Sequence, residues 1–435
     1  MTQRNACDPG LSPVQKHGHM PAATGPHRRS VIVGMGATML SACVRDRGGD
    51  HSPDDTLRLA LDEAAGSPPA QALSRLAGFE ARTLPASQRL DLVTARAGLA
   101  IDERLAAIPA TRGAKGGYRP LADAGPIAAD HYALLLARPL GPVTPQAAQA
   151  RLTRELDGLH ARAAAAFSTI GITGGSIGDR YSRLWRDERF LYPDAAAAVA
   201  DMTRMLEAAR ARVSATIGPV PAWCTDVGVR TLSAEEIAAG RNGYRAVPTP
   251  TQPGAYIVDL KQLGRRPSWT LPSVVAHELL PGHMIQLGLE GIAPPHPLRI
   301  TYAGSFVEGW GIHAEAVAAE DGAFADPRTM LGHLHWLIFR VARALADLGI
   351  HLDRWSLDAA RARLIEWQGE PGYFAPYDTE LPRIVQEPAQ RVGEAMAWLA
   401  IADAARGRRG AARIALRRRL LDHGRMRSDA VGNIS

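Results

Sequence analysis

The stretch VVAHELLPGHMIQ, residues 274–286, places two histidines and a glutamate close together in the sequence. Histidine nitrogens and carboxylate oxygens are common zinc ligands, and a catalytic zinc site keeps one position open for water. In the zinc-binding pattern H-E-x-x-H, the glutamate beside the first histidine takes a proton from that water. We therefore take His277 and His283 as candidate metal ligands and Glu278 as the candidate general base.

The spacing of the two histidines departs from that pattern, because His283 follows His277 by six residues and not by four. On a straight helix, residues six apart lie about 120° around and about 9 Å along from each other, too far to share one ion. Pro281 lacks the N–H that would bond the carbonyl of His277, and Gly282 can adopt dihedral angles that other residues avoid. A helix broken there would return His283 to His277. The alternative is an ordinary proline-kinked helix with two hydrogen-bonded histidines.

A third candidate ligand lies in the segment SFVEGWGIHAE, residues 305–315. Glu308 offers the carboxylate that would complete a set of two histidines and one acid. Glu315 follows two helical turns later on nearly the same face, where it can accept a hydrogen bond from the second ring nitrogen of a metal-bound histidine. Gly309 and Gly311 would let another part of the backbone approach this helix closely.

The next helical segment, residues 333–355, carries polar side chains on one stripe of an otherwise apolar surface. Such a stripe faces solvent or lines a polar cleft, because charged side chains are seldom buried without a partner. In a cleft, His351 could stabilise the oxyanion formed at a scissile carbonyl, and Arg340 or Arg343 could hold the oxyanion or a peptide carboxylate. The stripe consists of His333, Arg340, Arg343, Asp347 and His351.

The elements that must position these side chains are mainly helices. Apolar residues recur at three- and four-residue spacing over residues 56–65, 85–107, 144–167 and 195–216, and again around the motif helices. Residues 255–260 form the clearest strand, which could pair with an extended substrate. We predict a mainly α fold, a large helical domain with a small β-sheet next to the helix that carries His277. We expect residues 56–170 to form an N-terminal helical region and residues 171–435 a helical zinc-peptidase-like region, the two making one continuous domain.

Three further side chains are assigned to the surroundings of the metal ligands or to substrate binding. They are Gln286 on the motif helix, Asp347 on the polar stripe, and Tyr256 on the predicted strand. Each carries a polar group on an element that is expected to lie beside the candidate ligands.

Composition is that of a globular protein, with 46% hydrophobic and 22% charged residues in a chain of 435. The net charge of +6 comes largely from residues 406–427, which hold nine arginines and one aspartate. No aromatic residues alternate with these arginines, so we expect no nucleic-acid partner. This basic segment is either the solvated face of a terminal helix or a contact with an anionic membrane.

The first 43 residues have the order of an export signal. Arg28 and Arg29 precede a short apolar run and the sequence Leu-Ser-Ala-Cys, which ends at Cys43. The arginine pair resembles a twin-arginine signal, and the last four residues resemble a lipoprotein signal in which the cysteine is acylated. We expect an exported protein of the cell envelope or periplasm, anchored to the membrane by a lipid on Cys43 and a tether at residues 44–55. The alternative is a signal without a lipid, and translation could start at Met20.

The segments HELLPGHMIQ, FVEGWGIHAE and RALADLGIHLDRWS together resemble three successive signatures of the domain-of-unknown-function 885 (DUF885) family. Its members are regarded as zinc-metallopeptidase-like proteins of the gluzincin type. The resemblance implies a mostly helical fold, with His277, His283 and Glu308 as metal ligands and Glu278 as general base. Two positions depart from the family pattern: His313 replaces an aromatic residue, and Glu394 replaces a tyrosine that follows a P-x-Q block.

These observations lead to one expectation and two alternatives. We expect a zinc-dependent peptidase with one Zn²⁺ per chain, which hydrolyses small peptides by means of a metal-activated water and a glutamate base. One alternative is a non-catalytic peptide-binding lipoprotein on the same scaffold. The other is a zinc hydrolase that acts on another amide or on an ester.

Overall fold

The computed structural model describes residues 53–108, 128–369 and 376–434, together with residues 120, 121, 123 and 125. The export signal predicted for residues 1–43, with Cys43, lies outside the described residues, as does most of the predicted tether, residues 44–55. Among the residues described, none of the helices is both long enough and apolar enough to cross a membrane. All of them belong to one compact unit that begins at His51.

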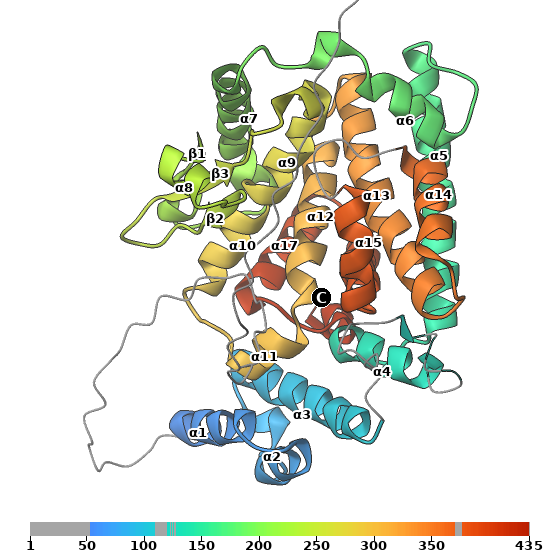
Figure 1. The fold of residues 1–435 in the computed structure, drawn as a ribbon. Coiled ribbons are helices and arrows are strands. Elements are labelled where there is room, and N and C mark those ends of the chain that lie inside the picture. Colours follow the sequence, from blue (N-terminus) through green and yellow to red (C-terminus); the bar gives the residue numbers. More distant parts are fainter. Residues whose placement is uncertain are drawn as a thin grey trace, which may run out of the picture. The chain divides into compact units, whose positions relative to one another are not determined.

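Helices α1 to α7 form the N-terminal part of this unit (Figure 1). Three of them begin at side-chain caps: Thr144 accepts a hydrogen bond from the Ala147 N–H, Ser176 from the Asp179 N–H, and Asp194 from the Ala197 N–H. The helices predicted from apolar spacing are confirmed, with ends that differ by three residues at most. In chain order the helices are α1 (Pro53–Ala65), α2 (Pro69–Leu76), α3 (Ala86–Ala106), α4 (Ala128–Leu140), α5 (Pro145–Thr169), α6 (Ile177–Trp185) and α7 (Ala195–Thr216).

A small sheet follows α7, as predicted next to the motif helix, and its strands are β1 (Val227–Thr231), β2 (Tyr244–Ala246) and β3 (Gly254–Val258). The strand order is β1-β3-β2, with β1 parallel and β2 antiparallel to β3. The short helix α8 (Ala234–Ala238) connects β1 to β2. The sheet therefore places β3, the strand predicted at residues 255–260, between two partners.

This central position corrects one prediction. Residues 255–260 were expected to pair with an extended substrate, but both edges of β3 already carry hydrogen bonds, to Val227–Thr231 on one side and Tyr244–Ala246 on the other. The free edges of the sheet are those of β1 and β2. The pattern of residues 255–260 predicts the strand, but it does not reveal that strands of five and three residues pair with its two edges.

The C-terminal part of the unit holds the motif helices and their supports (Figure 1). Helix α13 packs against α5, α14 and α16, and α12 packs against α16. In chain order the helices are α9 (Leu271–Glu278), α10 (His283–Glu290), α11 (Pro297–Tyr302), α12 (Ser305–Glu320), α13 (Pro327–His351), α14 (Leu357–Gln368), α15 (Tyr377–Gln386), α16 (Gln390–Ala405), α17 (Gly410–His423) and α18 (Ser428–Val431).

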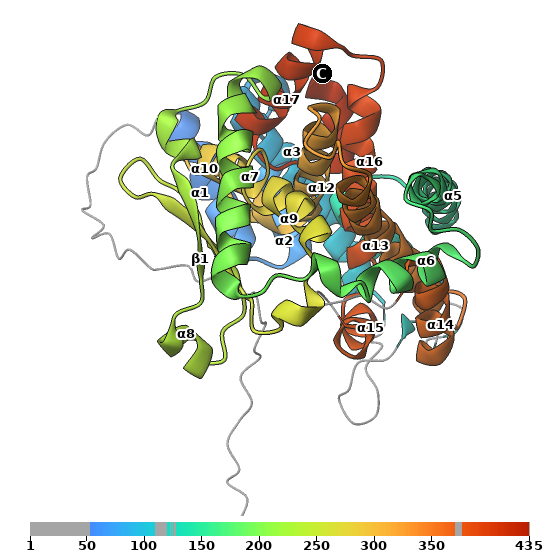
Figure 2. The same ribbon diagram turned by 90° about the horizontal axis from the view of Figure 1, so that it is seen from above.

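Two large apolar cores meet at α12. One core joins α4, α5 and α6 to α13 and α16, and the other joins α7 and the sheet to α9, α10 and α17. Ile312 of α12 packs in the first core, and Trp310, two residues earlier, packs in the second. Seen from above, α9 lies between α7 and α13 (Figure 2). The helices that carry the candidate ligands are thus fixed by packing on several sides.

Candidate metal centre

The helix that was predicted to break does break. Helix α9 ends at Glu278, and α10 begins at His283, with a turn between them in which the Leu280–Pro281 peptide bond is cis. A Cβ atom on Gly282 would lie 1.9 Å from the carbonyl oxygen of His277, so only glycine fits this close return of the chain. The indole N–H of Trp310 on α12 donates to the Pro281 carbonyl at 3.2 Å and holds the turn in place.

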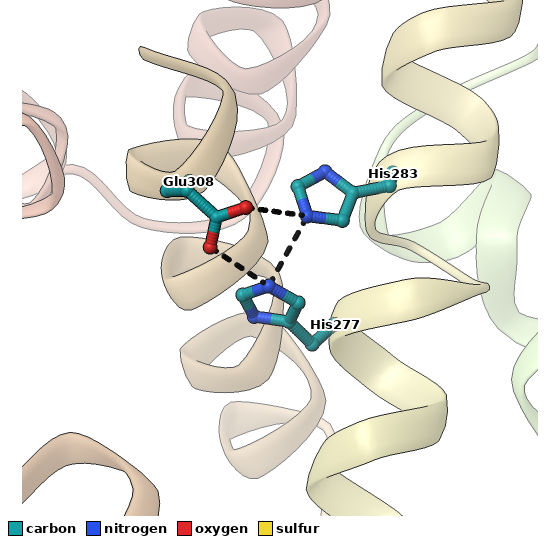
Figure 3. Close-up of side chains that lie close together, drawn as sticks. All are labelled: His277, His283 and Glu308. Atoms are coloured by element: carbon teal, nitrogen blue, oxygen red, sulfur yellow. Dashed lines mark hydrogen bonds and ion pairs between the residues drawn. The ribbon is translucent and has the colours of Figure 1, made fainter. Parts of the chain in front are cut away.

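As a result, the side chains of His277, His283 and Glu308 converge from α9, α10 and α12 (Figure 3). The two Nε2 atoms are 3.1 Å apart. The Glu308 carboxylate lies 3.4 Å from Nε2 of His277 through Oε2, and 3.6 Å from Nε2 of His283 through Oε1. Ligands at zinc-bond length in a tetrahedral arrangement lie about 3.3–3.4 Å apart. The three side chains therefore fit the spacing that one zinc ion requires.

The partners of the other ring nitrogens strengthen this fit. Nδ1 of His277 lies 2.9 Å from Oε1 of Glu315, and Nδ1 of His283 lies 3.4 Å from Oε1 of Gln286. Both of these oxygens accept hydrogen bonds, so each neutral ring carries its proton on Nδ1. The two Nε2 atoms then face each other with lone pairs beside a carboxylate. Such a convergence of electron pairs in a buried place favours a bound cation.

The cluster is buried on one side and open on the other. His277 and His283 are 4% and 0% exposed, whereas the side chain of Glu308 is 28% exposed. Solvent therefore reaches the cluster from the side of Glu308. A three-ligand site with one accessible side leaves a position for water, which is the arrangement of catalytic zinc sites.

The carboxylates around the cluster stay ionised in spite of their burial. Burial raises the pKa of Glu308, but the hydrogen bonds with the two histidines and the charges of His277 and Arg340 outweigh it and hold that pKa well below its usual range. Burial lowers the pKa of His277, but its hydrogen bonds with Glu308 and Glu315 outweigh burial and raise the pKa to about 9. Without a metal, this ring therefore holds a second proton near neutral pH, on the Nε2 atom beside Glu308, and a bound cation would displace that proton.

Glu278, the candidate base, forms an ion pair with Arg245 of β2 at 2.6 Å. Burial raises the pKa of Glu278, but the Arg245 guanidinium and the two histidines outweigh it, so the pKa is lowered overall. The carboxylate is thus ionised and oriented, as a general base must be. Sequence reasoning missed Arg245, because it sits in a strand of three residues with no periodic pattern to place it beside α9.

Arg340 is the residue of the polar stripe that reaches the cluster. Its Nη1 lies 3.5 Å from Oε2 of Glu308, and its Nη2 lies 3.5 Å from Nε2 of His277. His333 also lies nearby, since its Nδ1 is 3.5 Å from Oε2 of Glu315. Glu315 therefore connects two histidines, one of which is a candidate ligand. Its predicted place beside the ligands agrees with the structure.

Arg343 points to a different group of charges. Its Nη1 donates to Oε1 of Glu380 at 2.7 Å, and its Nη2 lies 3.6 Å from Glu394. Arg391 joins the same group, 2.8 Å from Glu380. Glu394 thus balances buried arginines, and Arg343 pairs with these acids and not with the candidate ligands.

His351 does not lie at the cluster either. Its Nδ1 accepts a hydrogen bond from the Leu121 N–H at 3.0 Å, and its Nε2 donates to the Ile384 carbonyl at 2.9 Å. It follows Arg340 by eleven residues on α13, which is about 16 Å along the helix axis. With both ring nitrogens engaged by backbone, His351 has no free group for the oxyanion role expected of it. The stripe as a whole is buried, so it neither faces solvent nor lines one cleft.

Asp347 and Tyr256, two other candidates, have separate places. Asp347 is buried and accepts hydrogen bonds from the Tyr132 hydroxyl and from the backbone N–H groups of Ala389 and Arg391. These contacts hold helices together and do not reach the ligands. Tyr256 of β3 lines a pocket that also contains His277 and Glu278, and its role in substrate binding stays a prediction.

Comparisons with known proteins support the fold. The model of the DUF885 family, described as a bacterial protein of unknown function, matches residues 38–420. A candidate lipoprotein from Colwellia psychrerythraea is similar with a TM-score of 0.63 and 20% sequence identity, over 87% of this chain and 71% of that chain. A candidate lipoprotein of unknown function from Shewanella oneidensis gives a TM-score of 0.59 and 16% identity, over 87% and 72%. At these identities the likeness shows a common fold. No curated protein matches the chain.

Proposed function

The chain belongs to the DUF885 family of bacterial proteins of unknown function, and from this premise we propose that it is a zinc-dependent peptidase. One observation carries the proposal: the Nε2 atoms of His277 and His283 and the Glu308 carboxylate face a common point at zinc-ligand spacing. Glu278, the residue next to the first histidine, supplies an ionised carboxylate on the same side. A scaffold that only binds peptides would not need this fourth group.

The proposed reaction is hydrolysis of a peptide bond. Bound zinc would polarise the scissile carbonyl and make a water acidic enough to lose a proton near neutral pH. Glu278 accepts that proton and delivers it to the leaving nitrogen, as the C–N bond breaks and a C–O bond has formed. Arg245 keeps Glu278 ionised and oriented, and Arg340, beside Glu308, is placed to stabilise the negative charge on the carbonyl oxygen.

We also propose that the protein acts outside the cytoplasm. The signal pattern that ends at Cys43 supports export and lipid anchoring. The two structural relatives are themselves described as candidate lipoproteins. A peptidase so anchored would meet peptides in the cell envelope.

The first test is metal content. We expect about one zinc per purified chain by elemental mass spectrometry, and a loss of that zinc in His277→Ala and in His283→Ala. His131→Ala is the matched control, because His131 lies on α4 outside the cluster and its replacement should leave zinc bound. A folded wild-type chain that takes up no zinc would overturn the proposal.

The second test is cleavage of a mixed peptide library by the wild type and by Glu278→Gln, followed by mass spectrometry. Glu278→Gln should keep its zinc and cleave about 10²- to 10⁴-fold more slowly, because a general base contributes rate enhancement of this size. Equal cleavage by both proteins would refute the role of Glu278. Zinc binding without any cleavage of peptides would favour a binding lipoprotein, or a hydrolase of esters or other amides, over a peptidase.

A further inference from the structure

The pocket beside the metal cluster has a chemical character of its own. Its empty space, counted together with the open solvent at its mouth, is about 670 Å³. Its floor includes His277 and Glu278, and its walls come from β3, from residues 265–274 and from α6 and α13. The pocket opens to solvent, so a peptide that reaches the cluster can extend along its walls.

Three arginines give the walls of this pocket a positive charge. Arg265 lies exposed at the mouth, Arg266 is buried, and Arg340 lies beside the cluster. The carboxylates among the lining residues are Glu278 and Glu315, and both are engaged elsewhere, with Arg245 and with two histidines. An anionic group of a ligand would therefore meet guanidinium groups, which bind carboxylates in a fork-like geometry.

The rest of the lining is aromatic. Trp185 and Trp336 are half-buried, and Phe339 is buried beneath Arg340 and Arg343, with the guanidinium carbons 5.8 and 4.1 Å from the ring centre. The indole N–H of Trp336 donates to the Thr270 carbonyl at 3.2 Å, which fixes that ring in the wall. Fixed aromatic faces favour a large apolar or aromatic side chain in the ligand.

The position of Glu278 indicates which part of a peptide occupies the pocket. The proton that Glu278 takes from water goes to the leaving nitrogen, which belongs to the fragment on the C-terminal side of the scissile bond. Glu278 lines this pocket, whereas His283 and Glu308 do not. The pocket therefore lies on the side of the leaving fragment.

Resting on the proposed function, we infer that this pocket binds the C-terminal residue of a short peptide. Its free carboxylate is held by Arg266 and Arg265, and its large apolar side chain lies against Trp185, Trp336 and Phe339. The substrates are thus short peptides cut next to a bulky C-terminal residue. Water is consumed, the last C–N bond of the chain is broken, the C-terminal amino acid leaves as the amine, and the shortened peptide leaves with a new carboxylate.

Binding to metal-free protein tests the pocket without depending on catalysis. The full chain, treated with a chelator so that zinc cannot bind the carboxylate, is titrated calorimetrically with N-acetylphenylalanine and with N-acetylphenylalaninamide. We expect the carboxylate to bind at least about tenfold more tightly, because a hydrogen bond between charged groups contributes that much. Equal affinities, or no binding of the carboxylate up to about 10 mM, would overturn the inference.

Variants then assign the preference to residues. In Arg266→Met, the affinities for N-acetylphenylalanine and its amide should differ by about threefold at most. If this buried replacement prevents folding, Arg265→Met at the exposed mouth takes its place and should reduce the same difference in affinity. Arg230→Met on β1 is the control, since Arg230 pairs with Glu236 outside the pocket and should leave the preference unchanged. N-acetylalanine should bind about tenfold more weakly than N-acetylphenylalanine. A preference that survives in both pocket variants would contradict the assignment.

Activity separates this inference from the proposed function. The zinc-loaded wild type is given matched peptides that end in phenylalanine, with either a free carboxylate or an amide, and kcat/KM is compared. A preference for the free acid of about tenfold or more supports the inference. Equal cleavage of both would refute it and leave a peptidase, whereas a zinc-bound protein that cleaves neither would refute the peptidase.

Discussion

His277 is held by carboxylates on both sides of its ring, Glu308 at Nε2 and Glu315 at Nδ1. The Glu315 hydrogen bond fixes the tautomer, so that Nε2 presents a lone pair to the metal. Glu315→Gln would lose the charge, and its amide could turn a donor toward Nδ1. We expect the affinity for zinc to fall about 10- to 100-fold, as is typical when such a partner is removed. Competition with a chromogenic chelator measures it.

Glu320→Gln provides the matched control for that experiment. Glu320 lies on the same helix, but it pairs with Arg413 and Arg417 on the opposite side from the ligands. Its replacement should leave zinc affinity within about twofold. If Glu315→Gln binds zinc as tightly as this control, Glu315 does not increase the affinity of His277 for zinc.

Residue types and spacing predicted the cluster well and its surroundings only in part. The separation of Glu308 and Glu315 by seven residues placed both on one helix face, and the structure agrees. Arg245 could not be found in this way, because its contact with Glu278 depends on how the sheet packs on α9. His351 was placed at the cluster because it shares a helix face with Arg340, but one face of a long helix passes several different neighbours.

Close approach of elements is what makes the site possible, and Gly311 is where α12 comes close to the ring of His277. A Cβ atom there would lie 2.6 Å from Cε1 and 2.7 Å from Nε2 of His277. Gly311→Ala favours a helix by about 1 kcal/mol, but it would displace the ligand ring. We expect zinc affinity to fall about tenfold or more while the chain stays folded. Zinc titration and circular dichroism together check this.

Gly158→Ala on α5 separates the two effects of such a change. The position has no heavy atom within 4 Å of an added Cβ, so only helix propensity acts there. The variant should unfold at a slightly higher denaturant concentration and bind zinc like the wild type. If Gly311→Ala matched Gly158→Ala in zinc affinity and in denaturant unfolding, the ring of His277 would accommodate the added methyl group without moving. That outcome would contradict the close contact seen at Gly311.

At the scale of elements, long amphipathic helices were predictable, and the sheet was predictable only at its centre. Helix α7 matches the apolar spacing of residues 195–216, and the Asp194 side chain caps its first turn, so the local signals and the fold agree. Strands β1 and β2, five and three residues long, have too little pattern to stand out. Their pairing with β3 joins segments up to 27 residues apart, as for Val227 with Gly254, and such pairing is decided by tertiary packing.

Helix α13 packs against helices from the N-terminal and C-terminal parts of the chain. The buried side chain of Asp347 on α13 forms a polar junction between these parts. Oδ1 accepts from the Tyr132 hydroxyl of α4 at 2.8 Å and from the Ala389 N–H at 3.0 Å, and Oδ2 accepts from the Arg391 N–H at 3.2 Å. These bonds connect the N-terminal helices to the start of α16. Because α16 supports α12, which carries Glu308, this junction fixes the frame of the metal cluster without touching it.

Asp347→Asn is therefore expected to change stability and leave zinc content alone. The asparagine can keep the two bonds at Oδ1, but its amide N–H₂ would face the Arg391 N–H, leaving donors opposed. A buried donor without an acceptor costs about 1–3 kcal/mol. Asp353→Asn, at an exposed residue that bonds Gln149, should change stability by less than about 0.5 kcal/mol.

The pH dependence of the difference in stability between the wild type and Asp347→Asn tests the junction further. Burial, which outweighs the hydrogen bonds, raises the pKa of Asp347 to about 7 from the ordinary 3.8. Between these values the folded chain holds a proton that the unfolded chain has released, so this carboxyl contributes stability at acid pH that is lost as the pH rises through 7. The asparagine does not titrate. The advantage of the wild type over Asp347→Asn in denaturant unfolding should therefore shrink between about pH 5 and pH 8. An advantage that grows over this range would mean that the junction lowers the pKa and prefers the ionised carboxylate.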